Sequence, residues 1–338
     1  MASQSPPQPT VLRVLLVRHA QSQNNAVAAK HYKDTTDANA LASRVPDPNL
    51  TPLGMVQAQA LASYYAKLQD TGIYAVWVSA MKRALQTAAP IASALNVPVI
   101  VRADVFEQGG VFEGEHRERV AEASTSSETT PLGLNKDGIG AELRRLGVQS
   151  ISHDENLFPP GTNGEQGWYR SGYETVEAAQ KRAHRVAEAL WQEAERVGHA
   201  REYNWTRKRQ YVDAQRGGPC LVIVAHGMFL DMLVRELLGI AHVEEPVPAP
   251  RRLVFPTCNT GRCTIDLTFD GFLRGGRAVS RRAASLAAWN ALDHLPPVDG
   301  NALTPEQRGQ VDGSSSMPAR TGGSARSYQE TYLEVGDA

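Results

Sequence analysis

The chain has 338 residues and a formal net charge of −1 at pH 7, so its length suits one large domain or two ordinary ones. This balanced charge gives no general attraction to nucleic acid or to an anionic membrane surface. No apolar stretch is as long as a membrane span, and residues 1–10 are polar and proline-rich, unlike a secretory leader. These features predict a soluble, cytoplasmic protein.

The first half of the chain alternates strand-like and helix-like segments. The apolar run at 11–17, Val-Leu-Arg-Val-Leu-Leu-Val, is typical of a buried parallel strand. Thr51 and Pro52 favour a helix start, because threonine caps a helix and proline is tolerated in its first turn. The further elements expected in this half are a helix at 53–67, a strand at 75–79, a helix at 82–95 and a short strand at 97–101.

The second half continues the alternation. Residues 174–197 are rich in alanine, glutamate, glutamine and arginine, which predicts a long helix. The other expected elements are a helix at 139–146, a strand at 220–225, a helix from 226 to 238 and an alternating edge strand at 262–269. Because strands and helices alternate, the expected fold class is α/β. We expect a three-layer α/β/α sandwich whose central sheet is mainly parallel, with an antiparallel edge strand.

Two stretches interrupt a domain expected at 11–295. Residues 115–172 hold Ser, Thr, Gly and Pro clusters, and a loop of this length is typical of a lid or a disordered excursion. Residues 198–219 interleave basic and aromatic side chains, which fits either a patch for an anionic ligand or nucleic acid, or a solvated loop. The solvated loop is the simpler interpretation, so nucleic acid is not the expected partner. We expect residues 1–10 and the Gly/Ser-rich tail at 296–338 to be disordered.

Histidine and arginine side chains follow three of the expected strands. Arg18 and His19 come directly after the first strand, and His226 follows the strand that ends at Ala225. The strand between them in the chain leads into Arg83. Open α/β sheets bind ligands beyond the carboxyl ends of their strands, so these side chains are expected to meet there. Two histidines and two arginines in one crevice predict a phosphate site that contains a nucleophile.

Six short segments in one order carry a more specific pattern. They are Leu16–Asn25, Leu50–Ala58, Ser79–Ala88, Phe106–Gly114, Val224–Gly227 and Cys258–Gly261. Together they resemble the histidine phosphatase superfamily, which has the phosphoglycerate-mutase-like fold, over roughly residues 11–295. The first segment is similar to the family's signature loop, the fourth to the stretch with its catalytic acid, and the fifth to the stretch with its second histidine. The start of the long helix, Gly172–Thr175, is similar to the phosphatase branch of the family.

The chemistry also follows from the residues themselves. A phosphomonoester carries about two negative charges near neutral pH, which repel nucleophiles. The forked donors of Arg18 and Arg83 suit its non-bridging oxygens. Their positive charges also lower the pKa of His19, so that a neutral ring can attack phosphorus and form a phosphohistidine. His226, expected as an imidazolium, would complete the oxyanion clamp.

The resemblance implies the remaining roles. Glu107 falls at the position of the general acid, which protonates the leaving alkoxide and later accepts a proton from the hydrolytic water. Glu113 and Glu115 lie nearby and are the alternative acids. Asn25, seven residues after the signature arginine, falls at the position of a phosphate ligand, in preference to Asn24.

Two further residues are candidate phosphate ligands: Ser22 through its hydroxyl, and Gly227 through backbone N–H groups at a helix start. The family commonly has glycine and glutamate where this chain has Ala20 and Gln21, a departure that bears on rate and substrate. This chemistry uses no metal and no cofactor. The remaining histidines and the three cysteines have no spacing typical of metal ligands.

The sequence therefore predicts a metal-independent phosphomonoesterase that acts on a small phosphorylated substrate. One alternative is a phosphoryl transferase of the phosphoglycerate mutase type, although Gln108–Gly114 lacks the tyrosine and arginine pattern of mutases. The other is a phosphate-binding or interaction protein of the same fold that uses residues 198–219 as its binding surface. Neither the natural substrate nor the oligomeric state can be predicted from the sequence.

Overall fold

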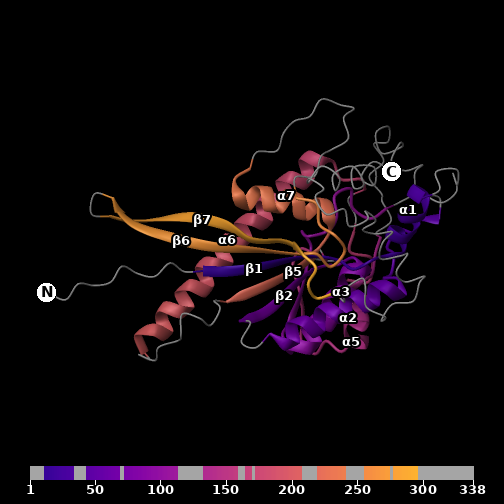
Figure 1. Ribbon diagram of the computed structural model, residues 1–338, viewed down its shortest axis with the longest axis horizontal. Helices are drawn as coiled ribbons and strands as arrows, with labels where there is room; N and C mark the ends of the chain where they lie inside the picture. Colours follow the sequence, from indigo (N-terminus) through magenta and orange to yellow (C-terminus); the bar gives the residue numbers. More distant parts are fainter. Residues whose placement is uncertain are drawn as a thin grey trace, which may run out of the picture.

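A computed structural model describes most of the chain from residue 11 to residue 295 (Figure 1). The described ranges are 11–33, 43–68, 72–112, 132–158, 164–169, 172–207, 219–240, 255–274 and 277–295. The expected disorder at 1–10 and 296–338 falls on residues outside these ranges. Among the described helices, none is both long enough and apolar enough to cross a bilayer.

The described strands form one seven-stranded sheet in the order β4-β3-β2-β5-β1-β6-β7. The neighbours from β4 to β1 pair in parallel, whereas β6 is antiparallel to β1 and β7 is antiparallel to β6. The strand bounds are β1 Val11–Arg18, β2 Ile73–Ser79, β3 Val99–Arg102, β4 Ile151–His153, β5 Cys220–Ala225, β6 Arg262–Arg274 and β7 Arg277–Ala291. The predicted mainly parallel sheet is confirmed, with two antiparallel strands at one edge.

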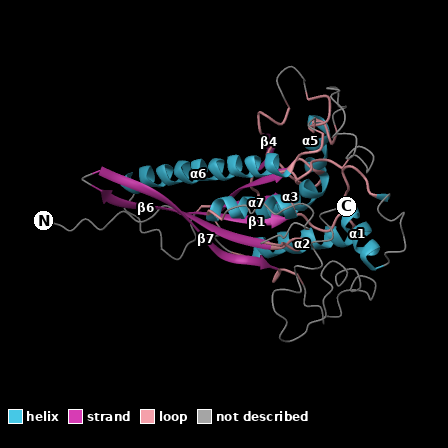
Figure 2. Cartoon of the chain, turned by 90° about the horizontal axis from the view of Figure 1, so that it is seen from above, coloured by secondary structure: helices cyan, strands magenta, loops and turns pink. Residues whose placement is uncertain are grey.

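The helices cover both faces of the sheet, which confirms the predicted three-layer α/β/α fold. Their bounds are α1 Gln23–Lys33, α2 Pro52–Lys67, α3 Lys82–Leu95, α5 Lys136–Arg145, α6 Val176–Arg207 and α7 Gly227–Leu238. One core lies between the sheet and the layer of α2, α3 and α5, and the other lies between the sheet and the layer of α6 and α7. Figure 2 shows the long helix α6 running alongside the β6–β7 hairpin.

The apolar run of β1 supplies both cores, because successive side chains of a strand point to opposite faces. Leu12, Val14 and Leu16 are buried in the core under α6 and α7. Leu15 and Val17 are buried in the core under α2 and α3. A strand buried on both faces needs this continuous apolar sequence, which is why the run could be recognised as central.

The predicted start of α2 is confirmed in detail. The Thr51 side chain accepts a hydrogen bond from the backbone N–H of Gly54 at 3.0 Å, and Pro52 is the first helical residue. Proline fits there because the first N–H groups of a helix have no intrahelical partner. Helix α3 begins at Lys82 as predicted and ends at Asn96, whose backbone is left-handed with φ of 52°.

Both expected insertions contain regular structure in the parts that the structure describes. Helix α6 continues beyond Val197 to Arg207, so residues 198–207 are helical and not a loop. This segment holds alanine, arginine and glutamate, and its single glycine costs only about 1 kcal/mol of helix propensity. The rest of the expected basic loop, at 208–218, lies outside the described residues. Residues 132–158 supply α5 and β4, and β4 extends the central sheet by pairing with β3, so this part of the expected lid or disordered excursion has regular structure.

Strand β7 was not predicted, and β6 is longer than expected. The sequence of β7, Arg-Ala-Val-Ser-Arg-Arg-Ala-Ala-Ser-Leu-Ala-Ala-Trp-Asn-Ala, is rich in alanine, which is depleted in strands. Its conformation depends on the ladder with β6, which runs from Arg262↔Ala291 to Arg274↔Arg277. The expected edge strand at 262–269 is therefore covered on its outer side, and β7 is the edge.

Candidate active site

The carboxyl ends of β1, β2 and β5 bring the predicted histidines together. In the sheet, Arg18 of β1 lies opposite Ala225 of β5, and β5 also pairs with β2. These strands point toward the side of the molecule that holds α1 (Figure 1). As a result, the ring centroids of His19 and His226 lie 5.1 Å apart, although the two residues are far apart in the sequence. The prediction that the two rings meet beyond the strand ends is confirmed.

His19 is buried, with 3% of its surface exposed, and its two ring nitrogens have different partners. Nδ1 lies 2.7 Å from the carbonyl oxygen of Ala20, so it carries the proton and donates it to that oxygen. Nε2 therefore has a lone pair, which accepts a hydrogen bond from Arg83 Nε at 3.2 Å. Burial, followed by the charges of Arg83 and Arg18, lowers the pKa of His19 well below 6.5. The ring is neutral near neutral pH, as nucleophilic attack requires.

His226 begins helix α7, and its environment differs from the expectation. Its Nε2 lies 2.8 Å from the hydroxyl oxygen of Ser79 at the end of β2. Burial lowers the pKa of His226 well below 6.5, and the charge of Arg83 lowers it further. In the ligand-free protein the ring is therefore neutral, and the expected imidazolium is wrong for this state. A hydrogen bond from a neutral ring is still available to a phosphate oxygen.

Arg18 and Gly227 lie in contact. The Nη1 group of Arg18 donates a hydrogen bond to the Thr257 carbonyl at 2.6 Å, which fixes one arm of the guanidinium. A Cβ atom added to Gly227 would lie 3.3 Å from Arg18 Nε, a tight contact, so glycine lets the start of α7 approach the arginine closely. The arrangement places the positive end of a helix and a guanidinium at one point, where an anion is stabilised.

Glu107 lies at the start of the same helix. One of its carboxylate oxygens accepts hydrogen bonds from the backbone N–H of Phe229 at 3.1 Å and of Gln108 at 2.9 Å. The carboxylate therefore satisfies a donor in the first turn of α7, the helix that His226 opens. Burial lowers the pKa of Arg83, and the negative charge of Glu107 opposes part of this lowering. The alternative acids Glu113 and Glu115 lie outside the described residues.

Ser22 and Asn25 make a reciprocal cap at the start of α1. Asn25 Oδ1 accepts from the Ser22 backbone N–H at 3.1 Å and from its hydroxyl at 3.0 Å, while Ser22 Oγ accepts from the Asn25 N–H at 3.2 Å. This pattern satisfies donors that a helix start leaves open. Asn259 Nδ2 also contacts Asn25 Oδ1, at 3.3 Å, and donates to the His19 carbonyl at 2.9 Å. Phosphate binding by Ser22 and Asn25 stays a prediction.

The loop that carries His19 accommodates Ala20 and Gln21 without strain. Positive φ among the described non-glycine residues occurs only at Asn96, Thr260 and Asn290, so position 20 does not need the freedom of glycine. The Ala20 N–H donates to the Thr87 hydroxyl at 3.0 Å. Gln21 Oε1 accepts from the Thr51 hydroxyl at 2.7 Å, so this loop is held by the first turn of α2.

Arg182 on α6 is a positioning residue that the sequence analysis missed. Its side chain is 4% exposed and pairs through two hydrogen bonds, at 2.8 and 2.5 Å, with the carboxylate of Glu174. Its Nη1 also donates to the carbonyls of Asp104 at 3.0 Å and Phe106 at 2.9 Å, in the loop that carries Glu107. The guanidinium lies 3.6 Å from the Phe106 ring centroid. Arg182 therefore fixes the loop of the predicted acid.

Replacing Arg182 with methionine is expected to lower the free energy of unfolding by about 3–5 kcal/mol, because it leaves Glu174 as an unpaired buried charge. Urea unfolding measures this change. The double variant with Glu174→Gln should recover part of the loss. As a control, Arg196→Met removes the exposed arginine of the pair with Glu193 and should cost less than about 1 kcal/mol. Equal losses in the two arginine variants would contradict the role given to Arg182.

Buried neutral histidines predict a loss of stability in mild acid. Burial lowers the pKa of His19 and His226 well below 6.5, and that of His294 to about 4. As the pH falls below 6.5, the unfolded chain binds protons at these rings before the folded protein does, so acid favours unfolding. Each ring should lower the free energy of unfolding by about 1 kcal/mol between pH 7 and 5.5. Urea unfolding across this range tests the prediction, and a constant free energy would contradict it.

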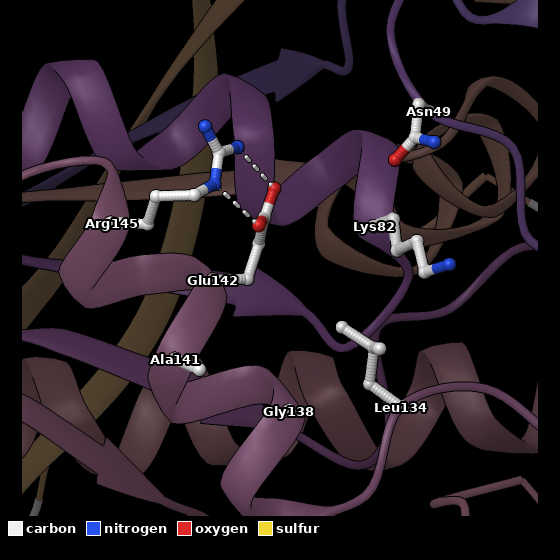
Figure 3. Close-up of a pocket in the computed structure, with 7 residues that line it drawn as sticks. All are labelled: Asn49, Lys82, Leu134, Gly138, Ala141, Glu142 and Arg145. Carbon is white, nitrogen blue, oxygen red and sulfur yellow. Dashed lines mark hydrogen bonds and ion pairs between the residues drawn. The ribbon is translucent and has the colours of Figure 1, made fainter.

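A separate pocket of about 310 Å³ lies between α5, the start of α3 and the segment before α2. Figure 3 shows Glu142 and Arg145 paired on the α5 side, with Asn49 and Lys82 on the other side. The pocket is lined by Asn49, Lys82, Leu134, Gly138, Ala141, Glu142 and Arg145. Gln86 donates to Asn49 at 3.0 Å and to Glu142 at 2.8 Å, which joins the two sides. The sequence analysis had not singled out these residues.

Comparisons with known proteins agree with the resemblance. A curated relative from Hydrogenobacter thermophilus (strain DSM 6534 / IAM 12695 / TK-6), named "Putative phosphoserine phosphatase 2", is 35% identical over 105 residues, which are 31% of this chain and 44% of the relative. The chain thus spans less than half the length of this relative. A solved mycobacterial glucosyl-3-phosphoglycerate phosphatase is 20% identical, with 83% of this chain and 99% of that chain covered and a TM-score of 0.40.

A solved ecdysone phosphate phosphatase from Bombix mori is 17% identical, with 80% of this chain and 91% of that chain covered and a TM-score of 0.41. The profile of the histidine phosphatase superfamily (branch 1) matches residues 14–137. The matched segment contains Arg18, His19, Arg83 and Glu107, whereas His226 follows later in the chain. Residues 14–137 are thus similar to the histidine phosphatase superfamily, in agreement with the resemblance found in the sequence.

Proposed function

We propose that this protein hydrolyses phosphomonoesters through a phosphohistidine on His19. The observation that carries the proposal is the state of the His19 ring: Nδ1 donates to the Ala20 carbonyl, and the lone pair of Nε2 lies beside Arg83. A buried, neutral imidazole with a fixed tautomer is a nucleophile. Because two guanidinium groups act on this ring, its natural target is an anionic electrophile, and a phosphoryl group fits that description.

In the first half of the reaction, substrate oxygens take over the donors of Arg83, which releases the lone pair of His19 Nε2. This nitrogen forms a bond to phosphorus while the bond from phosphorus to the leaving oxygen breaks. His19 Nδ1 keeps its proton, held by the Ala20 carbonyl. Arg18, Arg83 and backbone groups at the start of α7 stabilise the charge on the non-bridging oxygens.

Glu107 supplies the proton for the leaving oxygen. In the second half, its carboxylate takes a proton from water, whose oxygen attacks phosphorus as the bond to His19 Nε2 breaks. The products are inorganic phosphate and the original neutral ring. The position of Glu107 supports this role, because one oxygen is held by the Phe229 N–H and the carboxylate lies near enough to Arg83 to affect its pKa. This scheme uses no metal ion and no cofactor.

The proposed substrate class is a small phosphate ester, as is phosphoserine, the substrate after which the curated relative is named. The test is release of inorganic phosphate from a small aryl phosphate near pH 6, in the presence of EDTA. We expect turnover that is proportional to protein concentration and unaffected by EDTA. Absence of turnover on this ester and on a panel of natural phosphate esters, with the protein folded, would contradict the proposal. Dependence on added bisphosphoglycerate, with return of the phosphoryl group to the substrate, would instead identify a mutase.

A further inference from the structure

Ser79, the last residue of β2, contacts His226 at the centre of the site. Its hydroxyl oxygen lies 2.8 Å from His226 Nε2, and both residues are fully buried. The Ser79 oxygen also accepts a hydrogen bond from the Met81 backbone N–H at 3.3 Å. A serine hydroxyl has one proton to donate and can accept two hydrogen bonds, so the position of its proton depends on which of these partners is a donor.

Two arrangements of protons are possible when the His226 ring is neutral. In the first, Ser79 donates its proton to Nε2 and the ring proton is on Nδ1. In the second, Nε2 donates to Ser79, and the hydroxyl proton then needs another acceptor. No other acceptor for this hydroxyl lies within the described part of the chain. The first arrangement leaves one buried group without a partner, the Nδ1–H of His226, whereas the second leaves two, the Ser79 O–H and the Nδ1 lone pair. Because each buried group without a partner costs about 1–3 kcal/mol, the first arrangement is favoured.

His226 Nδ1 supports the same assignment. It is buried and has no hydrogen-bond partner among the residues that the structure describes. A buried polar atom without a protein partner is rare, and it points to a ligand or a water molecule as the missing partner. The neighbouring ring is that of His19, at 5.1 Å between centroids, so a phosphoryl group on His19 would bring oxygens close to this histidine. A phosphate oxygen needs a donor there, and a bare lone pair on Nδ1 would repel it.

We propose that Ser79 is a positioning residue that holds His226 in the Nδ1–H tautomer, so that Nδ1 donates a hydrogen bond to the phosphoryl group. The effect of Ser79 on catalysis rests on the proposed function. The tautomer of His226 does not, because it is a property of the ligand-free protein. The low pKa of His226 adds support, because burial and the charges of Arg83, Arg182 and Arg18 keep the ring neutral. A neutral ring has one proton, and its placement decides which nitrogen can donate.

Nitrogen-15 NMR of histidine-labelled protein tests the tautomer without requiring turnover. In the wild-type protein near pH 7 we expect His226 Nδ1 to give the signal of a protonated nitrogen and Nε2 that of an unprotonated one. Inorganic phosphate should shift the Nδ1 signal more than the Nε2 signal. A wild-type spectrum with the proton on Nε2 would overturn the proposal, whether or not the protein is a phosphatase.

Substitutions test the consequence for activity. Ser79→Ala should lower kcat/KM by about 10- to 100-fold, as loss of a group that orients a catalytic histidine does, and should remove the preference for Nδ1–H. Ser79→Thr keeps the hydroxyl and should restore both. The exposed Ser93 of α3 gives a matched control, because Ser93→Ala should change neither. Full activity and an unchanged tautomer in a folded Ser79→Ala protein would overturn the proposal.

A pair of substitutions at His226 separates its two nitrogens, in case the Ser79 variants do not fold. The amide nitrogen of asparagine can occupy the place of Nδ1, whereas that of glutamine reaches toward the place of Nε2. We therefore expect His226→Asn to bind inorganic phosphate more tightly, and to keep a kcat/KM about 10-fold higher, than His226→Gln. The reverse order would show that Nε2 faces the phosphate, which would overturn the proposal.

Discussion

Replacing His19 with alanine is expected to abolish phosphate release, with kcat/KM lowered by at least about 10⁴-fold. The variant loses the Nε2 lone pair that the Ala20 carbonyl and Arg83 hold in place. The two arginines would still bind phosphate, because the charge of the site is unchanged or more positive. We therefore expect inorganic phosphate to inhibit the wild-type protein. It should still bind the His19→Ala variant, and calorimetry measures this binding.

A matched histidine control is available on α6. His184 is 64% exposed and pairs with Glu236 near the end of α7, whereas the site lies at the start of that helix, so His184→Ala should retain wild-type activity. A His19→Ala protein that releases phosphate at the wild-type rate would require a different nucleophile. If His19→Ala and His184→Ala both lost activity, the loss would come from folding and not from the removal of a nucleophile, which urea unfolding would show.

Replacing Arg83 with methionine is expected to lower kcat/KM by about 10³-fold, because it removes forked donors from the charge that develops on phosphorus. Arg83→Lys should recover only part of the activity, since an ammonium group cannot make the paired hydrogen bonds of a guanidinium. The exposed Arg196 supplies the control: Arg196→Met should leave turnover unchanged.

The same variant should change the pH dependence. Burial is the main cause of the low pKa of His19, and the charge of Arg83 is the next. Without Arg83 this pKa rises toward 6.5, so the acid limb of the kcat/KM profile should move to higher pH. Comparing wild type and variant on one substrate cancels the ionisation of the substrate itself. A shift toward lower pH, or no shift with full activity, would contradict the role of Arg83.

The candidate site could be predicted because it depends on strands buried on both faces. The apolar runs before His19 and His226 identified central parallel strands, and the ends of such strands meet at one edge of the sheet. The tautomer of His19 and its contact with Arg83 required coordinates, since backbone carbonyls have no signal in the sequence. The charge of His226 was mispredicted because its burial could not be judged from one sequence.

Other features depend on tertiary contacts. Strand β7 has an alanine-rich sequence with weak preference for a strand, and its pairing with β6 determines its structure. Arg182 did leave a signal: it lies three residues after Ala179 and one before Ala183, on the face of α6 that is buried. A charged residue on the apolar face of a predicted helix indicates a buried ion pair.

The central claim is that the phosphoryl group passes through His19. Its most direct test is to quench the wild-type protein in alkali during turnover of an activated aryl phosphate, whose leaving group departs without a proton, and to locate phosphate by peptide mass spectrometry. Phosphohistidine survives alkali and is lost in acid, unlike a phosphoserine. We predict one phosphorylated histidine, His19, which accumulates further in a Glu107→Gln variant because hydrolysis of the intermediate is slowed. Phosphate on another residue, or turnover with no phosphorylated protein in either form, would contradict the mechanism.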